Sequence, residues 1–154
     1  MDKFDRAILD ILQRDNRTPQ RLIAEQVSLS PAAVQRRVAA LEAAGVIEQN
    51  IAVVDPKAVG ARVTVVVEVH LINDQSAVVR AVKAQFRAVP EVQQCYHVTG
   101  NGGLILIILL PDFESYETLS TRLFADNDLV ASFRSLPVLD RVKVGLGVCV
   151  AVGE

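Results

Sequence analysis

The spacing of apolar residues changes near residue 50, and this change divides the chain into two parts. Before it, apolar residues recur every three or four positions, which is the period of an amphipathic helix. After it, they alternate with polar residues or run continuously, as in β-strands. We therefore expect a helical domain at residues 1–50, a hinge strand and linker at 51–61, and a sheet-containing domain at 62–154.

Three helices are predicted in the first part. The first has an apolar face that is lost in the polar stretch RDNRT, and this face consists of Phe4, Ile8, Ile11 and Leu12. The second helix begins at the pair Thr18-Pro19 and runs to about Val27, because threonine is a favoured N-cap and proline is favoured at the first helical position.

The third helix completes a recognisable DNA-binding arrangement. Ser30 and Pro31 repeat the pairing of N-cap and proline, and Gly45 ends the helix. Its buried face is predicted to contain Val34, Val38 and Leu41. Two capped helices joined by the short VSLS connection describe a helix-turn-helix, in which the second of the pair enters the major groove.

The outward side of this third helix carries side chains suited to DNA. Glutamine can pair with adenine and arginine with guanine, and small alanines allow contact with thymine methyl groups. Within residues 14–37, five arginines face only two acidic residues, although residues 1–50 hold seven basic and seven acidic groups. We expect DNA contacts from Ser30, Ala32, Gln35, Arg36 and Arg37, together with phosphate contacts from Arg17 and Arg21.

Two of these assignments have structural alternatives. Arg37 lies at the flank of the helix, where it can instead serve a structural role by pairing with Glu42 or Glu25. Arg17 and Arg21 can equally belong to a solvated surface, which is the usual position of charged side chains.

The second part predicts an α+β fold. A short strand at 46–47 and 51–54 precedes the turn DPKAVG, and the expected elements after it are a strand at 63–71, a helix at 76–89, strands at 92–99 and 104–110 around NGG, a helix capped by Asp112, and strand segments from 130 to 150. The order β-α-β-β-α-β is the ferredoxin-like arrangement, here with an extra C-terminal strand. Its two helices would cover one face of the sheet.

A sheet covered on one face leaves apolar side chains on the other. These would be Val65, Val67 and Val69, or their alternates, together with half of the run LILIILL. An apolar patch of this size is seldom left in water, so we expect a homodimer that packs sheet against sheet.

The composition of the chain excludes several classes of protein. Hydrophobic residues make up 51% of the chain and charged residues 22%, which excludes a disordered protein. The longest apolar stretch is too short to span a membrane, the first ten residues lack the basic region of a signal peptide, and two cysteines do not form a disulfide framework. We expect a cytoplasmic protein that has no membrane association.

Cys95 and His97 share one face of a strand, but their pattern is a weak signal for chemistry. A structural zinc site needs about four ligands, and no other Cys or His cluster lies nearby in the sequence. A catalytic cysteine needs an oriented base and a third group. Sheet packing is therefore the favoured interpretation, and we predict no metal, no cofactor and no enzymatic activity.

Taken together, the segments DRAILDILQRDNR, LIAEQVSLSPAAVQRRVAALEAAGVIE and PEVQQCYHVTGNGGLILIILLPD resemble the Lrp/AsnC family of transcription regulators. The resemblance covers the chain from the first helix to about Lys143. It implies a helix-turn-helix, winged or simple, an inter-domain strand swapped between protomers, and a ferredoxin-like RAM domain that dimerises and often assembles dimers into octamers. It further implies an amino acid or related small molecule as effector.

The resemblance also implies an effector site, expected at Thr99, Gly100, Asn101, Gly102, Gly103, Leu104 and Ser135. The sequence departs from the family pattern at two positions. Gly103 stands where an acidic residue is common, so no carboxylate is available there for an ammonium group. Ser28 stands where a turn glycine is usual, and if the turn needs a positive φ, serine costs about 1 kcal/mol there.

These observations favour a homo-oligomeric regulator that binds double-stranded DNA and responds to a small molecule. The alternative is a small-molecule sensor or enzyme built on the ferredoxin-like domain, in which the helical domain serves assembly alone. Clustered acids, a nucleophile with a base, or a cofactor loop would favour that alternative, and the sequence shows none of them.

Overall fold

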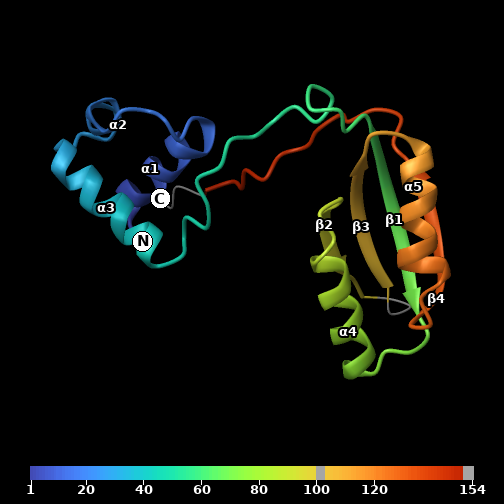
Figure 1. Ribbon diagram of the computed structural model, residues 1–154. Helices are drawn as coiled ribbons and strands as arrows, with labels where there is room; N and C mark the ends of the chain where they lie inside the picture. The colour runs from blue at the N-terminus through green and yellow to red at the C-terminus, as the bar shows by residue number, and fades with distance from the viewer. Residues whose placement is uncertain (100–102, 151–154) are drawn as a thin grey trace. The chain divides into compact units, whose positions relative to one another are not determined.

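The computed structural model describes residues 1–99 and 103–150. The chain forms two compact units, Met1–Ala52 together with the segment that begins at Lys143, and Val53–Val142 (Figure 1). Within the described ranges, no helix has the length and apolar character needed to cross a membrane.

The first unit contains the three predicted helices, α1 (Lys3–Arg14), α2 (Gln20–Val27) and α3 (Pro31–Ala43). They enclose a small apolar core made of Ile8, Ile23, Ala24, Val27 and Val34. Both Ile8 and Val34 are completely buried, so the predicted apolar faces of the first and third helices do point inward.

Both ends of α3 follow the prediction. The Ser30 hydroxyl oxygen accepts a hydrogen bond from the Ala33 N–H at 3.2 Å, which satisfies one donor of the first turn. At the other end, Gly45 adopts a φ of 69°, and its N–H donates to the carbonyl of Glu42 at 3.0 Å. The next N–H, from Val46, donates to the carbonyl of Leu41 at 2.9 Å, which completes a glycine-terminated helix end.

The start of α2 differs from the prediction. Thr18 does not cap this helix, which begins at Gln20 after Pro19 and has no side-chain cap. The Thr18 hydroxyl donates instead to the carbonyl of Asp15 at 2.7 Å, so it stabilises the turn that follows α1. The prediction of Thr18 as the N-cap was wrong because the helix begins one residue later than expected, so Pro19 occupies the N-cap position.

The second unit is the predicted ferredoxin-like domain. Its elements are β1 (Val63–Leu71), α4 (Ser76–Arg87), β2 (Val92–His97), β3 (Gly103–Leu110), α5 (Phe113–Ser120), the π-helical turn η1 (Thr121–Ala125) and β4 (Val130–Pro137). The strands pair antiparallel in the order β2-β3-β1-β4. This topology confirms the α+β class and the split βαβ arrangement.

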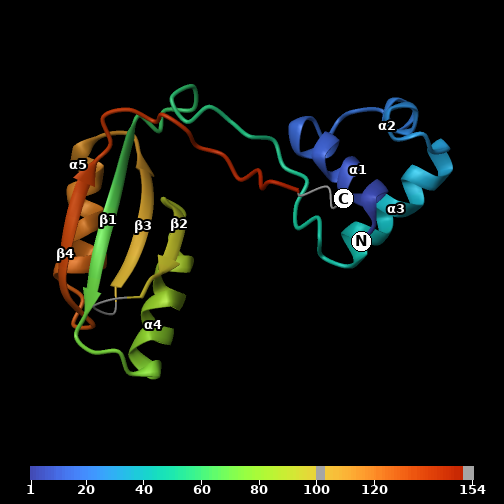
Figure 2. The same ribbon diagram turned by 180° about the vertical axis from the view of Figure 1, so that it is seen from behind.

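One face of the sheet is buried beneath both helices (Figures 1 and 2). Its core side chains alternate along the two central strands and comprise Val65, Val67, Val69 and Leu71 on β1 and Leu104, Leu106, Ile108 and Leu110 on β3. We call the opposite side the open face. It carries the alternate residues, which are partly exposed and include Val66, Glu68, His70, Ile105, Ile107 and Leu109.

The predicted outer strands are not formed in the single chain. Residues 46–47 and 51–54 form no strand, and β4 ends at Pro137, so the extra C-terminal strand is also absent from the described residues. Val53 is 93% exposed and Val142 is 87% exposed. A strand requires a neighbouring strand for its backbone hydrogen bonds, and in these segments the apolar pattern has no such neighbour within the chain.

We expect Ser28→Gly to stabilise the protein. Ser28 ends α2 with a φ of 55°, a left-handed conformation that costs a residue with a Cβ atom roughly 1 kcal/mol more than glycine. Denaturant unfolding should therefore show a gain of about 1 kcal/mol for the glycine variant. Ser28→Ala is the matched control, since alanine meets the same steric restriction. Equal stabilities for the glycine and alanine variants would contradict this explanation.

Candidate nucleic-acid interface and sheet cavity

The outward side of α3 is determined by its buried residues. Val34 is completely buried, and Leu41 is 6% exposed. Arg36 follows Val34 by two positions, about 200° around a helix, so it lies on the side away from the core. Ala32, Gln35 and Arg36 are all exposed. Among the described residues, Arg36 makes no ion pair, so its guanidinium donors are available to a DNA base or phosphate.

Arg37 is instead held against α1. Its Nη1 atom lies 2.8 Å from Asp2 Oδ2 and 2.7 Å from Asp5 Oδ1. Its guanidinium carbon lies 5.5 Å from the centroid of the Phe4 ring, a favourable position for a cation. Arg37 therefore joins α3 to α1, and contact between this residue and DNA stays a prediction.

The partners expected for Arg37 were wrong. Glu42 accepts a hydrogen bond from the Asn50 side chain at 2.9 Å, and Glu25 lies 3.8 Å from Arg21 on its own helix. The actual partners, Asp2 and Asp5, are 35 and 32 positions away in the sequence. Their position at the start of α1 becomes relevant only after the three helices pack together.

Asp2 and Asp5 also cap their own helix. The Asp2 Oδ1 atom accepts the N–H groups of Phe4 at 2.8 Å and Asp5 at 3.0 Å, and the Asp5 side chain accepts the Asp2 N–H at 2.8 Å. This reciprocal arrangement is a capping box. The Asp5 N–H, followed by the Arg37 guanidinium, lowers the pKa of Asp2 below its ordinary value of 3.8.

The remaining predicted DNA contacts occupy different positions. The Ser30 hydroxyl caps α3, and Ser30 itself is exposed at the start of that helix. Arg17 is exposed in the turn after α1, and Arg21 is exposed near the start of α2. Their contact with phosphate stays a prediction.

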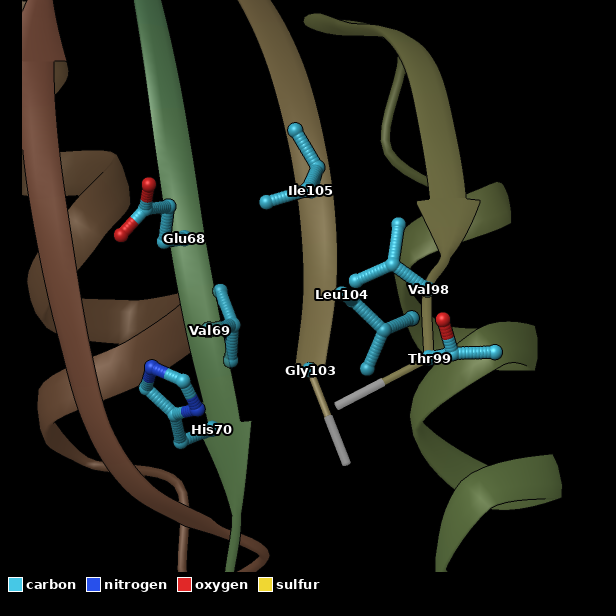
Figure 3. Close-up of a pocket in the computed structure, with 8 residues that line it drawn as sticks. All are labelled: Glu68, Val69, His70, Val98, Thr99, Gly103, Leu104 and Ile105. Atoms are coloured by element: carbon cyan, nitrogen blue, oxygen red, sulfur yellow. The ribbon is translucent and has the colours of Figure 1, made fainter. Parts of the chain in front are cut away.

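A cavity of about 300 Å³ lies where the ends of β1, β2 and β3 meet. Its lining includes Glu68 and His70 from β1, which leave that strand on the same side (Figure 3). The other lining residues are Val69, Val98, Thr99, Gly103, Leu104 and Ile105. We call this space the sheet cavity.

Gly103 contributes room to the sheet cavity. It pairs directly with His70 across the β1–β3 ladder, so a side chain at position 103 would share the open face with His70. A Cβ atom there would lie 3.8 Å from the imidazole carbon Cε1 of His70 and 3.4 Å from the Val69 carbonyl oxygen. These are ordinary contact distances, so a side chain would be accommodated at position 103, and the glycine leaves its volume unfilled.

Glu68 places a carboxylate at this cavity from the neighbouring strand. Two hydrogen bonds of 2.8 Å join it to the Nε and Nη2 atoms of Arg134, which lies opposite on β4. These bonds, and next the positive charge of Arg134, lower the pKa of Glu68, so it is ionised at neutral pH. Glu68 thus places an anion in the lining of the sheet cavity, and Arg134, the cation that pairs with it, lies next to Glu68 without being part of that lining.

The predicted small-molecule residues are only partly brought together. Thr99, Gly103 and Leu104 line the sheet cavity, whereas Gly100, Asn101 and Gly102 lie outside the described residues. Ser135 does not line it, because Ser135 pairs with the core residue Val67 and so lies on the helix-covered face, where its hydroxyl shares a hydrogen bond with the Tyr116 hydroxyl.

Glu68 and His70 were missed by the sequence analysis. The alternation of residues 63–71 already places them on one face, but their closeness to position 103 depends on the register between β1 and β3. Within the described ranges, Cys95 and His97 are not part of any group of three or more His, Cys, Asp or Glu side chains placed to hold a metal ion.

Each of the two units matches the model of a known protein family. Residues 1–48 match the model of a winged helix-turn-helix DNA-binding domain, and residues 64–147 match the Lrp/AsnC ligand binding domain. The chain belongs to the Lrp/AsnC family of DNA-binding transcriptional regulators.

Individual relatives agree with this assignment. The chain is 38% identical to an uncharacterised helix-turn-helix transcriptional regulator of Sinorhizobium fredii, with 99% of this chain and 90% of that protein covered. It is 30% identical to the leucine-responsive regulatory protein of Salmonella typhimurium, over 93% of this chain and 87% of that protein.

Solved structures show the same fold. An AsnC family transcriptional regulator from Agrobacterium tumefaciens superimposes with a TM-score of 0.89 at 27% identity, covering 97% of each chain. A transcriptional regulator from Neisseria meningitidis in complex with L-Met gives a TM-score of 0.86 at 28% identity, covering 97% of this chain and 96% of that one.

We expect the first unit to lose stability in acid through Asp2. Because folding lowers the pKa of Asp2, the unfolded chain takes up the proton first as the pH falls. The stabilising contribution is complete above the ordinary value of 3.8 and disappears as the pH falls through the lower value of the folded state. Thermal unfolding should therefore show a weaker acid dependence for Asp2→Asn than for the wild type.

The matched control for this experiment is Asp128→Asn, which changes an exposed aspartate outside the first unit. It should retain the wild-type dependence. The explanation fails if Asp2→Asn keeps the full acid dependence as well.

Proposed function

We propose that the protein acts as a homodimer that reads DNA through α3 and changes its DNA affinity when an amino acid binds in the sheet cavity. The observation that carries this proposal is the exposure of Arg36 on the side of α3 opposite the completely buried Val34, with the exposed Gln35 next to it. It acts by binding rather than by catalysis, and its place of action is the cytoplasm, where bacterial DNA is found.

The open face supports self-association. Val66, Ile105, Ile107 and Leu109 lie there at only partial exposure, and Leu136 on β4 is 39% exposed. A contiguous apolar surface on a small domain favours a partner, and a second copy of the same face gives a two-fold symmetric dimer. Two recognition helices related by that symmetry would suit a pseudo-palindromic operator.

The charges at the sheet cavity support a zwitterionic effector. Glu68 can accept an ammonium group on the lone pairs that Arg134 leaves unused, and Arg134 can donate to a carboxylate. The remaining lining is largely apolar and includes Val98, Leu104 and Ile105, which suits an aliphatic or thioether side chain. The structural relative from Neisseria meningitidis is a complex with L-Met.

Glu68 can replace the acidic side chain that is absent at position 103. The two positions lie on the same face of adjacent strands, since Glu68 pairs with Ile105 and His70 pairs with Gly103. A carboxylate displaced by one diagonal step can still meet an ammonium group in the same cavity, while Gly103 leaves room for the ligand.

The DNA-binding proposal is tested with Arg36→Ala. Fluorescence anisotropy would compare wild type and variant on the DNA upstream of the protein's own gene, against a scrambled duplex, over a salt series. Losing a bidentate arginine contact to a base should weaken specific binding by about 1–3 kcal/mol and leave binding to the scrambled duplex less affected.

Sedimentation of the same samples provides the structural control. Arg36→Ala should sediment as the same oligomer as the wild type, because Arg36 is exposed and remote from the apolar core of its unit. Unchanged affinity for the upstream DNA would show that Arg36 does not read the operator.

The effector proposal is tested with Glu68→Gln, which removes the charge while keeping the side-chain size. Isothermal titration with L-methionine and L-leucine should give affinities at least about tenfold weaker for the variant, since a charge-assisted hydrogen bond to the ammonium group is lost. At a fixed, subsaturating concentration of amino acid, the change in DNA affinity that it causes should also be smaller, because less of the variant is occupied.

Glu117→Gln is the matched control, since Glu117 is an exposed acid on α5 that does not line the sheet cavity. It should bind the amino acid as the wild type does. Equal amino-acid affinities for Glu68→Gln and the wild type would contradict the assigned role of Glu68.

A further inference from the structure

A second cavity, of about 470 Å³, lies at the outer edge of the sheet between α4 and β2. Its polar lining consists of Lys83 and Arg87 from α4 and Gln93, Gln94, Cys95 and His97 from β2. We call it the edge cavity. It shares only Leu104 with the sheet cavity, and none of its polar residues was given a role in DNA or amino-acid binding.

The edge cavity has a positive character. Lys83 and Arg87 are four positions apart on α4, so their side chains lie on one face of the helix. In the part of the chain that the structure describes, neither makes an ion pair, and no carboxylate lines the cavity. Two cations facing one concave space without a counter-ion favour the binding of an anion there.

The other polar groups can complete an anion site. Gln93 carries an amide donor, and the imidazole of His97 can donate from one ring nitrogen. The Gln94 side chain belongs to the open face, where it accepts a hydrogen bond from the Tyr96 hydroxyl at 2.7 Å. A phosphate dianion matches the two positive charges and offers three acceptor oxygens. A carboxylate offers one negative charge and two oxygens, which is a poorer match.

We propose that the edge cavity binds the phosphate group of a small phosphorylated molecule, as a site separate from both the DNA-binding helix and the sheet cavity. Lys83 and Arg87 neutralise the dianion, and the β2 side chains donate to its oxygens. Occupancy would join α4 to the edge strand β2, and the residues that follow this strand, Val98 and Thr99, line the sheet cavity. The phosphorylated molecule would thus be a second ligand of the same domain.

Cys95 provides a reporter inside this site. It is an exposed free cysteine, and it lines the edge cavity beside the two cations. Burial raises the pKa of its thiol, while the positive charges of Lys83 and Arg87 act in the opposite direction. A bound phosphate would cancel those charges and cover the sulfur atom, so both effects would slow alkylation at Cys95.

The experiment uses the full-length Cys149→Ser protein, which leaves Cys95 as the single cysteine. Alkylation by iodoacetamide, a neutral reagent, is followed while inorganic phosphate replaces chloride at constant ionic strength. We expect saturable slowing, with an apparent affinity at least about tenfold weaker in Lys83→Gln/Arg87→Gln. Arg80→Gln, which removes an exposed cation of α4 outside the cavity, should behave as the parent protein does.

Three results would overturn the proposal. The first is slowing that fails to saturate or that persists unchanged in the Lys83→Gln/Arg87→Gln protein. The second is an equal slowing of alkylation by acetate, which would show that the edge cavity attracts anions without selecting phosphate. The third is slower alkylation of Cys95 with duplex DNA but not with phosphate, which would show that the edge cavity binds nucleic acid. Circular dichroism of each variant establishes that the fold is intact before the rates are compared.

Discussion

The complete burial of Val34 among three helices determines which side of α3 is exposed. Because a helix turns by about 100° per residue, placing Val34 in the core directs Arg36 to the opposite side. Arg37, on the flank, is bound to the two aspartates that cap α1. Arg37 thus fixes the orientation of α3 against α1, while the side chain of Arg36 stays exposed.

The periodicity of side-chain direction also determines the faces of the second unit, where the period is two residues in a strand instead of 3.6 in a helix. Alternate residues of β1 and β3 form the core beneath α4 and α5, and the others form the open face. Glu68 therefore shares a surface with the position of Gly103, and the glycine leaves space beside it. The cavity arises where one strand lacks a side chain and the adjacent strand provides a charged one.

Periodicity and caps predicted most of the fold. The apolar period revealed each helix and the four sheet strands, and the pairs Ser30-Pro31 and Asp112-Phe113 marked two helix starts correctly. The failures have physical causes. The second helix begins one residue later than expected, with Pro19 at its N-cap, and segments 51–54 and 138–150 lack a neighbouring strand within one chain. Contacts set by tertiary packing, such as Arg37 with Asp2, carry no local signal.

Hydrogen–deuterium exchange of the full-length protein, free and bound to the DNA upstream of its gene, tests the central claim most directly. If α3 enters the major groove, exchange should slow in peptides that span Ser30 to Arg37, where the first helical amides lack intrahelical acceptors. The account would be contradicted if DNA bound tightly while these peptides exchanged at the free rate and protection appeared on another surface.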